Sequence, residues 1–170
     1  MELVVKGYTA KECDSDAEPD EFHEVLNGDP TFVEASFLNT GKNQFDIDDV
    51  ALFLWQSQVM ENSHLFAIRH QDGSLAAVLT LLIPHPRRKQ PWIGALIVHP
   101  ELSFDVVSIP LLEGLEHRLS EDGWDSIYVN PMQSQNEVIR HWLSCGFEFV
   151  ETRSDNNMRD VQVLRKSLKS

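Results

Sequence analysis

The sequence predicts a single α/β (α+β) domain with one mixed, mostly antiparallel β-sheet flanked by helices. The chain has 170 residues, about the size of one domain, and 42% of them are apolar, which is enough to bury a sizeable core. Between residues 64 and 99, three strand-like segments follow one another with short turns between them. Beyond them come a helical pattern, a strand, a second helical pattern and a hairpin.

The first 63 residues predict one short strand and three helices. Proline is favoured in a first helical turn, which places a helix start at Pro19, and the run Asn-Gly-Asp-Pro over residues 27–30 is a strong breaker. The third helix has apolar residues at helical spacing and acidic residues in its first turn. The predicted elements are a strand over 2–9 and helices over 19–26, around Phe32, Phe37 and Leu38, and over 46–60.

The central segment predicts an antiparallel meander. Residues 65–69 form a short strand, and the Asp72-Gly73 pair that follows is typical of a hairpin turn. Residues 75–83 are almost continuously apolar, as in a buried strand, and residues 92–99 form a third strand after a proline-bounded loop. Adjacent strands joined this closely pair antiparallel.

The last third predicts two helices and three strands. Apolar residues recur every four positions over 107–122, which predicts a long helix. A shorter helix over 136–144 ends at Gly146, where glycine suits a left-handed cap. Strands are predicted over 126–130, 147–152 and 161–168, the last two joined by a turn at 154–157.

Composition and charge exclude several classes of protein. The net charge is −13 with a sequence pI near 4.8, so we expect neither nucleic acid nor an anionic membrane as the partner, because both require a basic surface. No apolar run approaches the roughly 20 residues of a membrane span, and the N-terminus lacks the pattern of a signal peptide. We therefore expect a reduced, cytoplasmic protein.

Metal sites and common catalytic motifs are not predicted. The two cysteines, Cys13 and Cys145, cannot form a disulfide framework or a zinc spacing, and the seven histidines are scattered without helical pairing. The sequence has no nucleophile elbow, no Walker loop and no dinucleotide fingerprint. The one basic cluster, residues 87–89, is either a solvated loop tip or a contact for an anion.

Negative charge is concentrated in the first third of the chain. Residues 1–62 contain 14 acidic and 3 basic side chains, whereas residues 63–170 contain 13 acidic and 11 basic ones. One interpretation is a set of solvated helix faces that keep the protein soluble. The other is that this segment borders a site for a cationic ligand and raises the local concentration of that ligand.

Two segments resemble the GNAT superfamily of N-acetyltransferases. WIGALIVHPE (residues 92–101) and LLEGLE (111–116) are similar to the strand and the long helix that flank the family's glycine-rich turn. NEVIRHWLSCGFE (136–148) is similar to the family's Asn-x-x-Ala-x-x-x-Tyr-x-x-x-Gly-Phe segment. The resemblance covers residues 64–152, and residues 1–63 by element order. It implies an acceptor-side region over 1–63 and a coenzyme-side region over 64–170.

The resemblance also implies where acetyl-CoA binds. In the family, backbone N–H groups of the turn and a helix N-terminus hold the coenzyme's pyrophosphate. Aligning Pro100 and the helix places Ser103–Ser108 in that turn, with Val106 and Ser108 at the glycine positions and Asp105 adding a negative charge. The implied coenzyme-binding residues are Ile97, Val98, Ser103, Phe104, Asp105, Val106, Val107, Ser108, Asn136 and Trp142.

Candidate catalytic residues follow from the same resemblance. Trp142 stands where family members carry a tyrosine that protonates the leaving thiolate, and an indole cannot do so. Tyr128 on the preceding strand is the candidate acid, or else a core aromatic. Glu101 and His99 are the candidate bases that take a proton from the amine, or else surface residues.

The sequence therefore leaves two main functional hypotheses. The first is an acetyl-CoA-dependent N-acetyltransferase that transfers an acyl group to a primary amine, a cationic small molecule in particular. The second is a GNAT-like domain that has lost acyl transfer and serves as a binding or regulatory module, because the glycine turn and the tyrosine are replaced. An unrelated α/β fold is the third alternative. A homodimer is left open.

Overall fold

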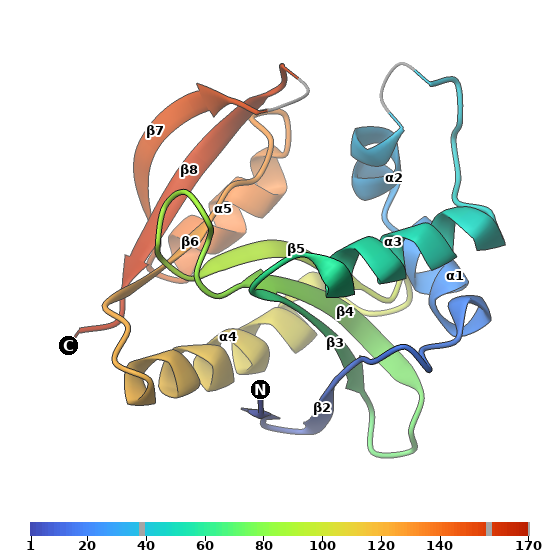
Figure 1. Ribbon diagram of the computed structural model, residues 1–170. Coiled ribbons are helices and arrows are strands. Elements are labelled where there is room, and N and C mark those ends of the chain that lie inside the picture. Colours follow the sequence, from blue (N-terminus) through green and yellow to red (C-terminus); the bar gives the residue numbers. More distant parts are fainter. Residues whose placement is uncertain (38–39, 156–157, 170) are drawn as a thin grey trace.

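The computed structural model describes residues 1–37, 40–155 and 158–169. Within these ranges the chain forms eight strands and five helices, arranged as in Figure 1. The strands are β1 (Leu3–Val5), β2 (Tyr8–Glu12), β3 (Ser63–Arg69), β4 (Leu75–Leu82), β5 (Trp92–Val98), β6 (Ser126–Val129), β7 (Glu148–Ser154) and β8 (Asp160–Ser167). The helices are α1 (Pro19–Asn27), α2 (Pro30–Ser36), α3 (Ile47–Val59), α4 (Phe104–Glu121) and α5 (Asn136–Ser144).

All eight strands belong to one sheet, in the order β1-β2-β3-β4-β5-β6-β8-β7. Every neighbouring pair is antiparallel except β5 and β6, which are parallel. The predicted meander β3-β4-β5 and the mixed, mostly antiparallel sheet are therefore confirmed. No described helix is long and apolar enough to cross a membrane.

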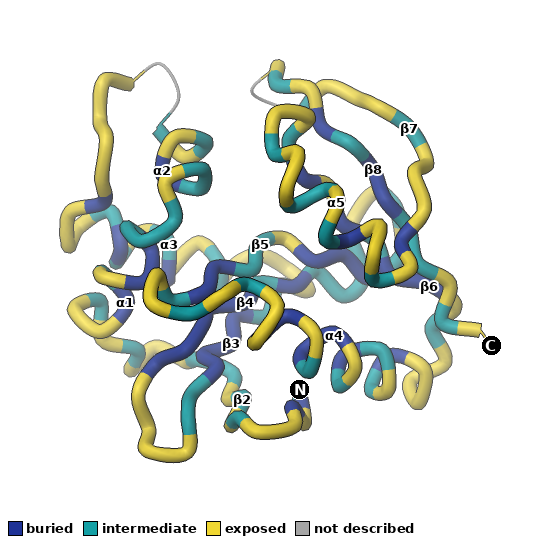
Figure 2. The backbone as a smooth tube through the Cα atoms, turned by 180° about the vertical axis from the view of Figure 1, so that it is seen from behind, coloured by how far each residue is buried: buried dark blue, intermediate teal, exposed yellow. Residues whose placement is uncertain are grey.

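Two hydrophobic cores lie on opposite faces of the sheet. Successive residues of a strand point to opposite faces, so Phe66 and Ile68 of β3 join the core under α4, whereas Leu65 joins the core under α1 and α3. The central strands are buried on both faces, and the helices expose their outer sides (Figure 2). The core under α4 continues into α5 through Trp142.

The N-terminal elements differ from the prediction in one place. The single strand predicted over 2–9 is a hairpin of two strands, because Gly7 adopts a φ of +85° that turns the chain between β1 and β2. The first two helices lie where they were expected, although Leu38 falls outside the described residues. Asp46 caps α3 and forms a capping box with Asp49.

Helix α4 begins at Phe104, three residues earlier than predicted, so the predicted turn over residues 103–108 is wrong. Ser103 is the extended N-cap residue, and Val106 to Ser108 already lie in the helix. Pro110 is thus in the second turn rather than the first and lacks the N–H that would bond to the carbonyl of Val106. That carbonyl accepts a hydrogen bond from the Tyr8 hydroxyl at 3.4 Å.

Helix α4 packs closely on the first strand because Gly114 has no side chain. A Cβ at this position would lie 2.0 Å from the carbonyl oxygen of Val4. The glycine in the middle of the long helix therefore allows β1 to cross directly over it. The predicted helix over 136–144 and the left-handed Gly146, with a φ of +99°, are confirmed. The predicted turn over 154–157 lies partly outside the described residues.

Candidate active site

Strand β5 loses its neighbour β6 after its second residue, because β6 ends there, and this opens the sheet. Their parallel pairing consists of Trp92 with Tyr128 and Ile93 with Val129. Beyond this point β6 ends and the chain turns toward β8, where the N–H of Gln162 donates to the Pro131 carbonyl at 2.9 Å. The edge of β5 that faces β6 has no strand neighbour in the described structure after Ile93. Alternate N–H groups on that edge are free to bind a ligand.

Gly94 marks the point of separation. The register between β4 and β5 slips by one residue there, since Thr80 pairs with Ala95 and Leu81 pairs with Ile93. A Cβ on Gly94 would lie 2.6 Å from the Thr80 hydroxyl oxygen. The resulting bulge bends β5, as bulges commonly do next to active sites.

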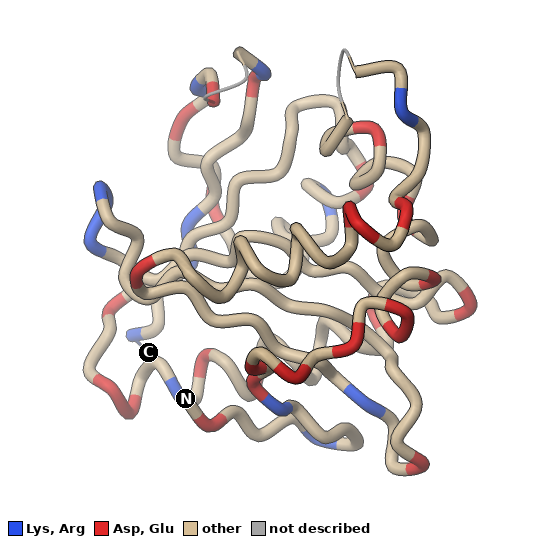
Figure 3. The backbone as a smooth tube through the Cα atoms, turned by 45° about the vertical axis from the view of Figure 1, so that its right-hand side comes forward, with Lys and Arg blue, Asp and Glu red and all other residues tan. Residues whose placement is uncertain are grey.

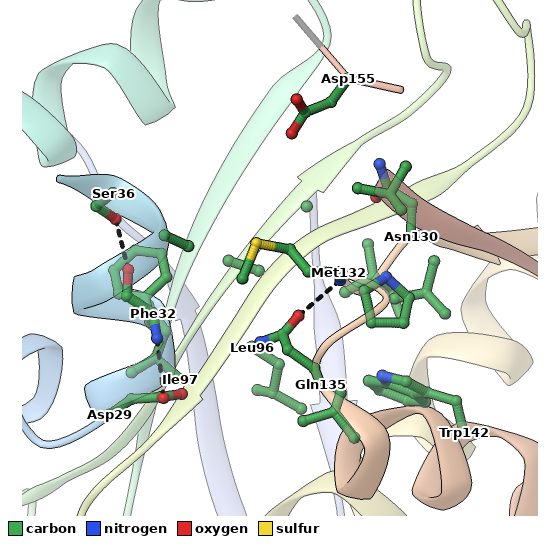
Figure 4. Close-up of a pocket in the computed structure, with 18 of the residues that line it drawn as sticks. Asp29, Phe32, Ser36, Leu96, Ile97, Asn130, Met132, Gln135, Trp142 and Asp155 are labelled. Atoms are coloured by element: carbon green, nitrogen blue, oxygen red, sulfur yellow. Dashed lines mark hydrogen bonds between the residues drawn. The ribbon is translucent and has the colours of Figure 1, made fainter. Parts of the chain in front are cut away.

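A cavity of about 390 Å³ lies over the opening between β5 and β6. Its floor is residues 93–97 of β5, and Figure 4 shows α2 on one side of it and the start of α5 on the other. The second side begins with the segment after β6, which closes on itself because the Met132 N–H donates to the Gln135 side-chain oxygen at 2.7 Å. The remaining lining residues include Asp29, Phe32, Ser36, Phe104, Asn130, Val138, Trp142, Asp155 and Arg159.

Asp29 places a carboxylate on the α2 side of the cavity. Its Oδ1 accepts the N–H of Phe32 at 3.1 Å and so caps α2, which begins at Pro30. The neighbouring Gly28 packs against Pro100, where a Cβ would lie 2.6 Å from the proline ring. This contact fixes the α1–α2 turn beside the end of β5, and Asp29 with it.

Arg159 lies at the rim of the cavity and links α2 to the segment that precedes β8. Its guanidinium donates to the Ala35 carbonyl of α2 at 2.6 Å and to the Asp155 carboxylate at 2.7 Å. A second cavity of about 460 Å³ is lined by Glu34, Ser134 and Asp160 among others. Arg159 lines both cavities, as do Ala35 and Met132.

His141 ties α5 to the beginning of α4. Its Nε2 lies 2.9 Å from the Ser108 hydroxyl, and its Nδ1 lies 3.1 Å from the Asp105 carboxylate. The three side chains resemble a catalytic triad, but Ser108 is only 1% exposed and no substrate can reach its hydroxyl. These hydrogen bonds therefore stabilise the packing of α5 on α4. The Cys145 thiol is 3.6 Å from the same Nε2, and burial raises the pKa of that thiol.

Of the residues that the resemblance assigned to acetyl-CoA, three line the cavity: Ile97, Phe104 and Trp142. Phe104 contacts the Trp142 ring edge-on, with the two centroids 6.0 Å apart. Val98, Val107 and Ser108 are buried outside the cavity lining, and Ser103, Asp105, Val106 and Asn136 are exposed. The coenzyme roles of all ten residues stay predictions.

The three candidate catalytic residues lie outside the cavity lining. His99 faces α1, because its Nδ1 accepts the N–H of Glu101 at 3.1 Å and its Nε2 lies 3.5 Å from the Glu24 carboxylate. Glu101 is exposed in the turn before α4. Tyr128 stacks on Trp92 with the centroids 5.0 Å apart. The structure therefore brings none of them to the opening between β5 and β6.

Sequence reasoning missed Asp29, Asn130 and Arg159 as lining residues. Asp29 was visible only as part of a breaker, although an aspartate before a proline is also a signal for a capped helix start. Asn130 follows directly after a predicted strand, at a position where side chains often reach a site. Arg159 carried no local signal, since its partner at Ala35 is 124 residues away in the sequence.

Several other acidic residues of the first third contact other parts of the chain rather than the cavity. Asp46 and Asp49 form the cap of α3 and both contact the Lys42 ammonium, Asp49 at 2.5 Å. Among the described residues, no group of three or more His, Cys, Asp or Glu side chains could hold a metal ion.

Solved structures resemble this chain over nearly its whole length. A protein described as a probable GNAT-family acetyltransferase from Chromobacterium violaceum matches 98% of this chain and 85% of its own, with 13% identity and a TM-score of 0.79. The ribosomal-protein-S18-alanine N-acetyltransferase of Escherichia coli matches with 15% identity, coverages of 96% and 95%, and a TM-score of 0.66. The fold is that of the GNAT acetyltransferases.

A further GNAT match is the spermidine/spermine N-acetyltransferase of Vibrio cholerae, with 12% identity, coverages of 95% and 93%, and a TM-score of 0.65. No protein-family model and no curated protein matches the chain by sequence. The likeness to the GNAT proteins is therefore one of fold, and the expected GNAT-like architecture is confirmed.

Proposed function

We propose that this protein transfers an acyl group from acetyl-CoA to the primary amine of a cationic small molecule. The observation that carries the proposal is the separation of β5 from β6, which places an unpaired strand edge at the floor of a cavity with Asp29 on its wall. The GNAT fold and the amine-acetylating proteins among its structural neighbours support the same reaction class.

The residues present fit the coenzyme in two respects. The cavity floor offers unpaired backbone groups and apolar side chains, which suit the thioester arm, and acetyl-CoA supplies the activated acyl group when bound. Helix α4, with 18 residues, begins without a side-chain cap, so its first N–H groups are available to a pyrophosphate. Ile97, Phe104 and Trp142 would line the arm.

Asp29 binds the acceptor in this proposal. A primary ammonium has an unperturbed pKa near 10, so the acceptor arrives as a cation and pairs with the carboxylate. The amine must lose a proton before it attacks, and the proton passes to solvent. N–H groups on the free edge of β5 then donate to the reacting carbonyl oxygen, where negative charge develops.

Trp142 does not supply an acid to the leaving group. Its indole N–H is not a usable proton donor at neutral pH. The reaction rate depends little on such an acid, because a thiol has a pKa of about 8.5 and leaves readily as the thiolate. We therefore expect the rate to rise with pH as the free amine becomes more abundant.

A binding module without acyl transfer is the second candidate, and Asp105 favours it. Its carboxylate lies at the second position of α4, is 68% exposed, and would face the phosphates of a coenzyme held there. The nearby His141 offsets this charge only while it is protonated. Calorimetry distinguishes the candidates, because a module that has lost the coenzyme gives no heat with acetyl-CoA at millimolar concentration.

The decisive experiment combines acetyl-CoA binding with an amine screen that monitors thiol release. The protein's own cysteines interfere little, because burial raises the pKa of Cys13 to about 11 and also raises that of Cys145. We expect the Asp29→Asn substitution to lower kcat/KM for a cationic amine by about tenfold or more, since one ion pair is lost. Asparagine still caps α2, so the fold is preserved.

The matched control is Asp20→Asn, which neutralises an exposed carboxylate in the first turn of α1. We expect this change to leave kcat/KM within twofold. Equal losses in the two variants would remove Asp29 from the acceptor site. No heat with acetyl-CoA at millimolar concentration, together with no turnover of any amine, would support the binding module instead.

A further inference from the structure

Helix α3 exposes a stripe of large apolar side chains along its outer face. Leu52, Trp55 and Val59 follow one another at helical spacing and are 51%, 60% and 55% exposed, and Met60 adjoins them at the helix end with 54%. The opposite face of the helix carries Val50 and Leu54 into the core. No described element of the chain covers the stripe.

The two ends of the stripe have opposite charge. Asp48 lies at its beginning, is exposed, and has no ion-pair partner in the described structure. At the other end lies the loop between β4 and β5, since the Ile83 N–H donates to the Asn62 carbonyl just after α3 at 2.9 Å. Figure 3 shows Lys and Arg in this loop beyond one end of α3, and acidic residues at the helix start.

The charge of the loop is only partly neutralised. Arg88 pairs with Glu151 at 2.8 Å, while Arg87 and Lys89 are exposed and make no ion pair with any described residue. Glu61 follows the end of α3, and Glu61 with Glu151 leaves the three basic residues of the loop one positive charge in excess. The stripe therefore runs from an acidic start to a basic end.

We propose that the α3 stripe is the interface of a homodimer in which two copies of α3 pack antiparallel about a two-fold axis. A two-fold interface brings the same patch of both copies together, so each patch must complement itself. Antiparallel packing satisfies this requirement, because Asp48 of one copy meets the basic loop of the other at both ends. The helix is about 20 Å long, which gives the pair several turns of contact.

A second copy fits this surface better than a lipid bilayer. The apolar stripe alone would suit both, but only a second copy offers a basic loop to Asp48 and an Asp48 to the basic loop, and these contacts at both ends offset the repulsion between two acidic chains. The stripe is also separate from the cavity, because none of its residues lines the cavity. The proposal therefore does not depend on acyl transfer.

Sedimentation velocity of the full chain is the first test. We expect the wild type to sediment at twice its 19.4 kDa mass at tens of micromolar. Trp55→Glu should give the monomer, with a dissociation constant at least 100-fold weaker. The matched control is Phe149→Glu on β7, which places the same charge on an equally exposed apolar residue and should leave the dimer intact.

Charge exchange tests the antiparallel arrangement directly. The double variant Arg87→Glu, Lys89→Glu should weaken the dimer at least tenfold at low salt, and adding Asp48→Lys should restore most of the loss. Circular dichroism and thermal melting check that each variant is folded. A monomeric wild type at 100 µM would overturn the proposal, as would a dimer that survives Trp55→Glu or shows no rescue by Asp48→Lys.

Discussion

Helices α2 and α5 face each other across the cavity, and they are held in different ways. Each buries a single side chain, Val33 in α2 and Trp142 in α5. Trp142 belongs to the main core and packs against Phe147 with the ring centroids 5.3 Å apart. Helix α2 instead packs on the smaller second core through Val33, beside an aromatic group in which Phe32 stacks on Phe45 with the ring centroids 5.6 Å apart.

The difference indicates that the two sides of the cavity differ in rigidity. We call the α5 side the fixed wall and the α2 side the adjustable wall. The α5 side packs on the larger core, with α4 and one face of the sheet, whereas Val33 of α2 belongs to the smaller core on the other face, with α1 and α3. We therefore expect the α5 side to open locally at a higher free energy than the α2 side. The α2 side is secured by its cap at Asp29 and by the bond from Arg159 to Ala35, both at the cavity rim. In a GNAT fold with a fixed coenzyme side, an adjustable acceptor side would allow acceptors of different size.

The largest expected effect comes from truncating the buried ring of the fixed wall. Trp142→Ala should lower the free energy of unfolding by about 3–5 kcal/mol, because it leaves a large void in the main core. Phe32→Ala, in the adjustable wall, removes a half-buried ring and should cost about 1–2 kcal/mol. Urea denaturation measures both, and equal losses would contradict the distinction between the walls.

A smaller effect is expected at the hydrogen bonds between α4 and α5. His141→Ala leaves the Ser108 hydroxyl buried without its partner, which should cost about 1–3 kcal/mol. Adding Ser108→Ala should recover part of this loss, since the unpaired hydroxyl is then removed. A double-mutant cycle with no recovery would mean that His141 acts through packing on Phe104 alone, whose ring lies 4.8 Å away.

The smallest change in global stability is expected at Arg159. Arg159→Met should alter the free energy of unfolding by about 1 kcal/mol or less, because the guanidinium is near the surface. The amides of α2 should nevertheless exchange with deuterium several-fold faster, while those of α5 keep their rates. Unchanged exchange in α2 would show that Asp29 and the aromatic group suffice to hold this wall.

The order and type of the elements were predictable from the sequence. Helical spacing of apolar residues located α3, apolar runs on either side of an Asp-Gly turn located β3 and β4, and Gly146 located the end of α5. The start of α4 was misplaced because the prediction assumed a turn that needs glycine, and Val106 and Ser108 follow the helix instead. Gly7 was similarly overlooked as the turn of a hairpin.

The site was less predictable than the fold. Trp142 and Phe104 could be assigned because the resemblance covers their segments. The cavity itself arises where β5 and β6 part and where α2 lies across from α5, and both depend on distant pairings. Asp29 and Arg159 reach the cavity only through that arrangement, so no local pattern distinguishes them from surface residues.

The strand order at the end of the sheet bears on how the protein is made. Strand β8 follows β7 in the sequence but lies between β6 and β7. During synthesis β7 therefore leaves the ribosome with no strand to pair with, and β6 keeps an open edge, until the residues of β8 emerge. Arg159, just before β8, also closes the cavity rim. This part of the sheet and the cavity should thus be completed in one step that waits for the residues of β8.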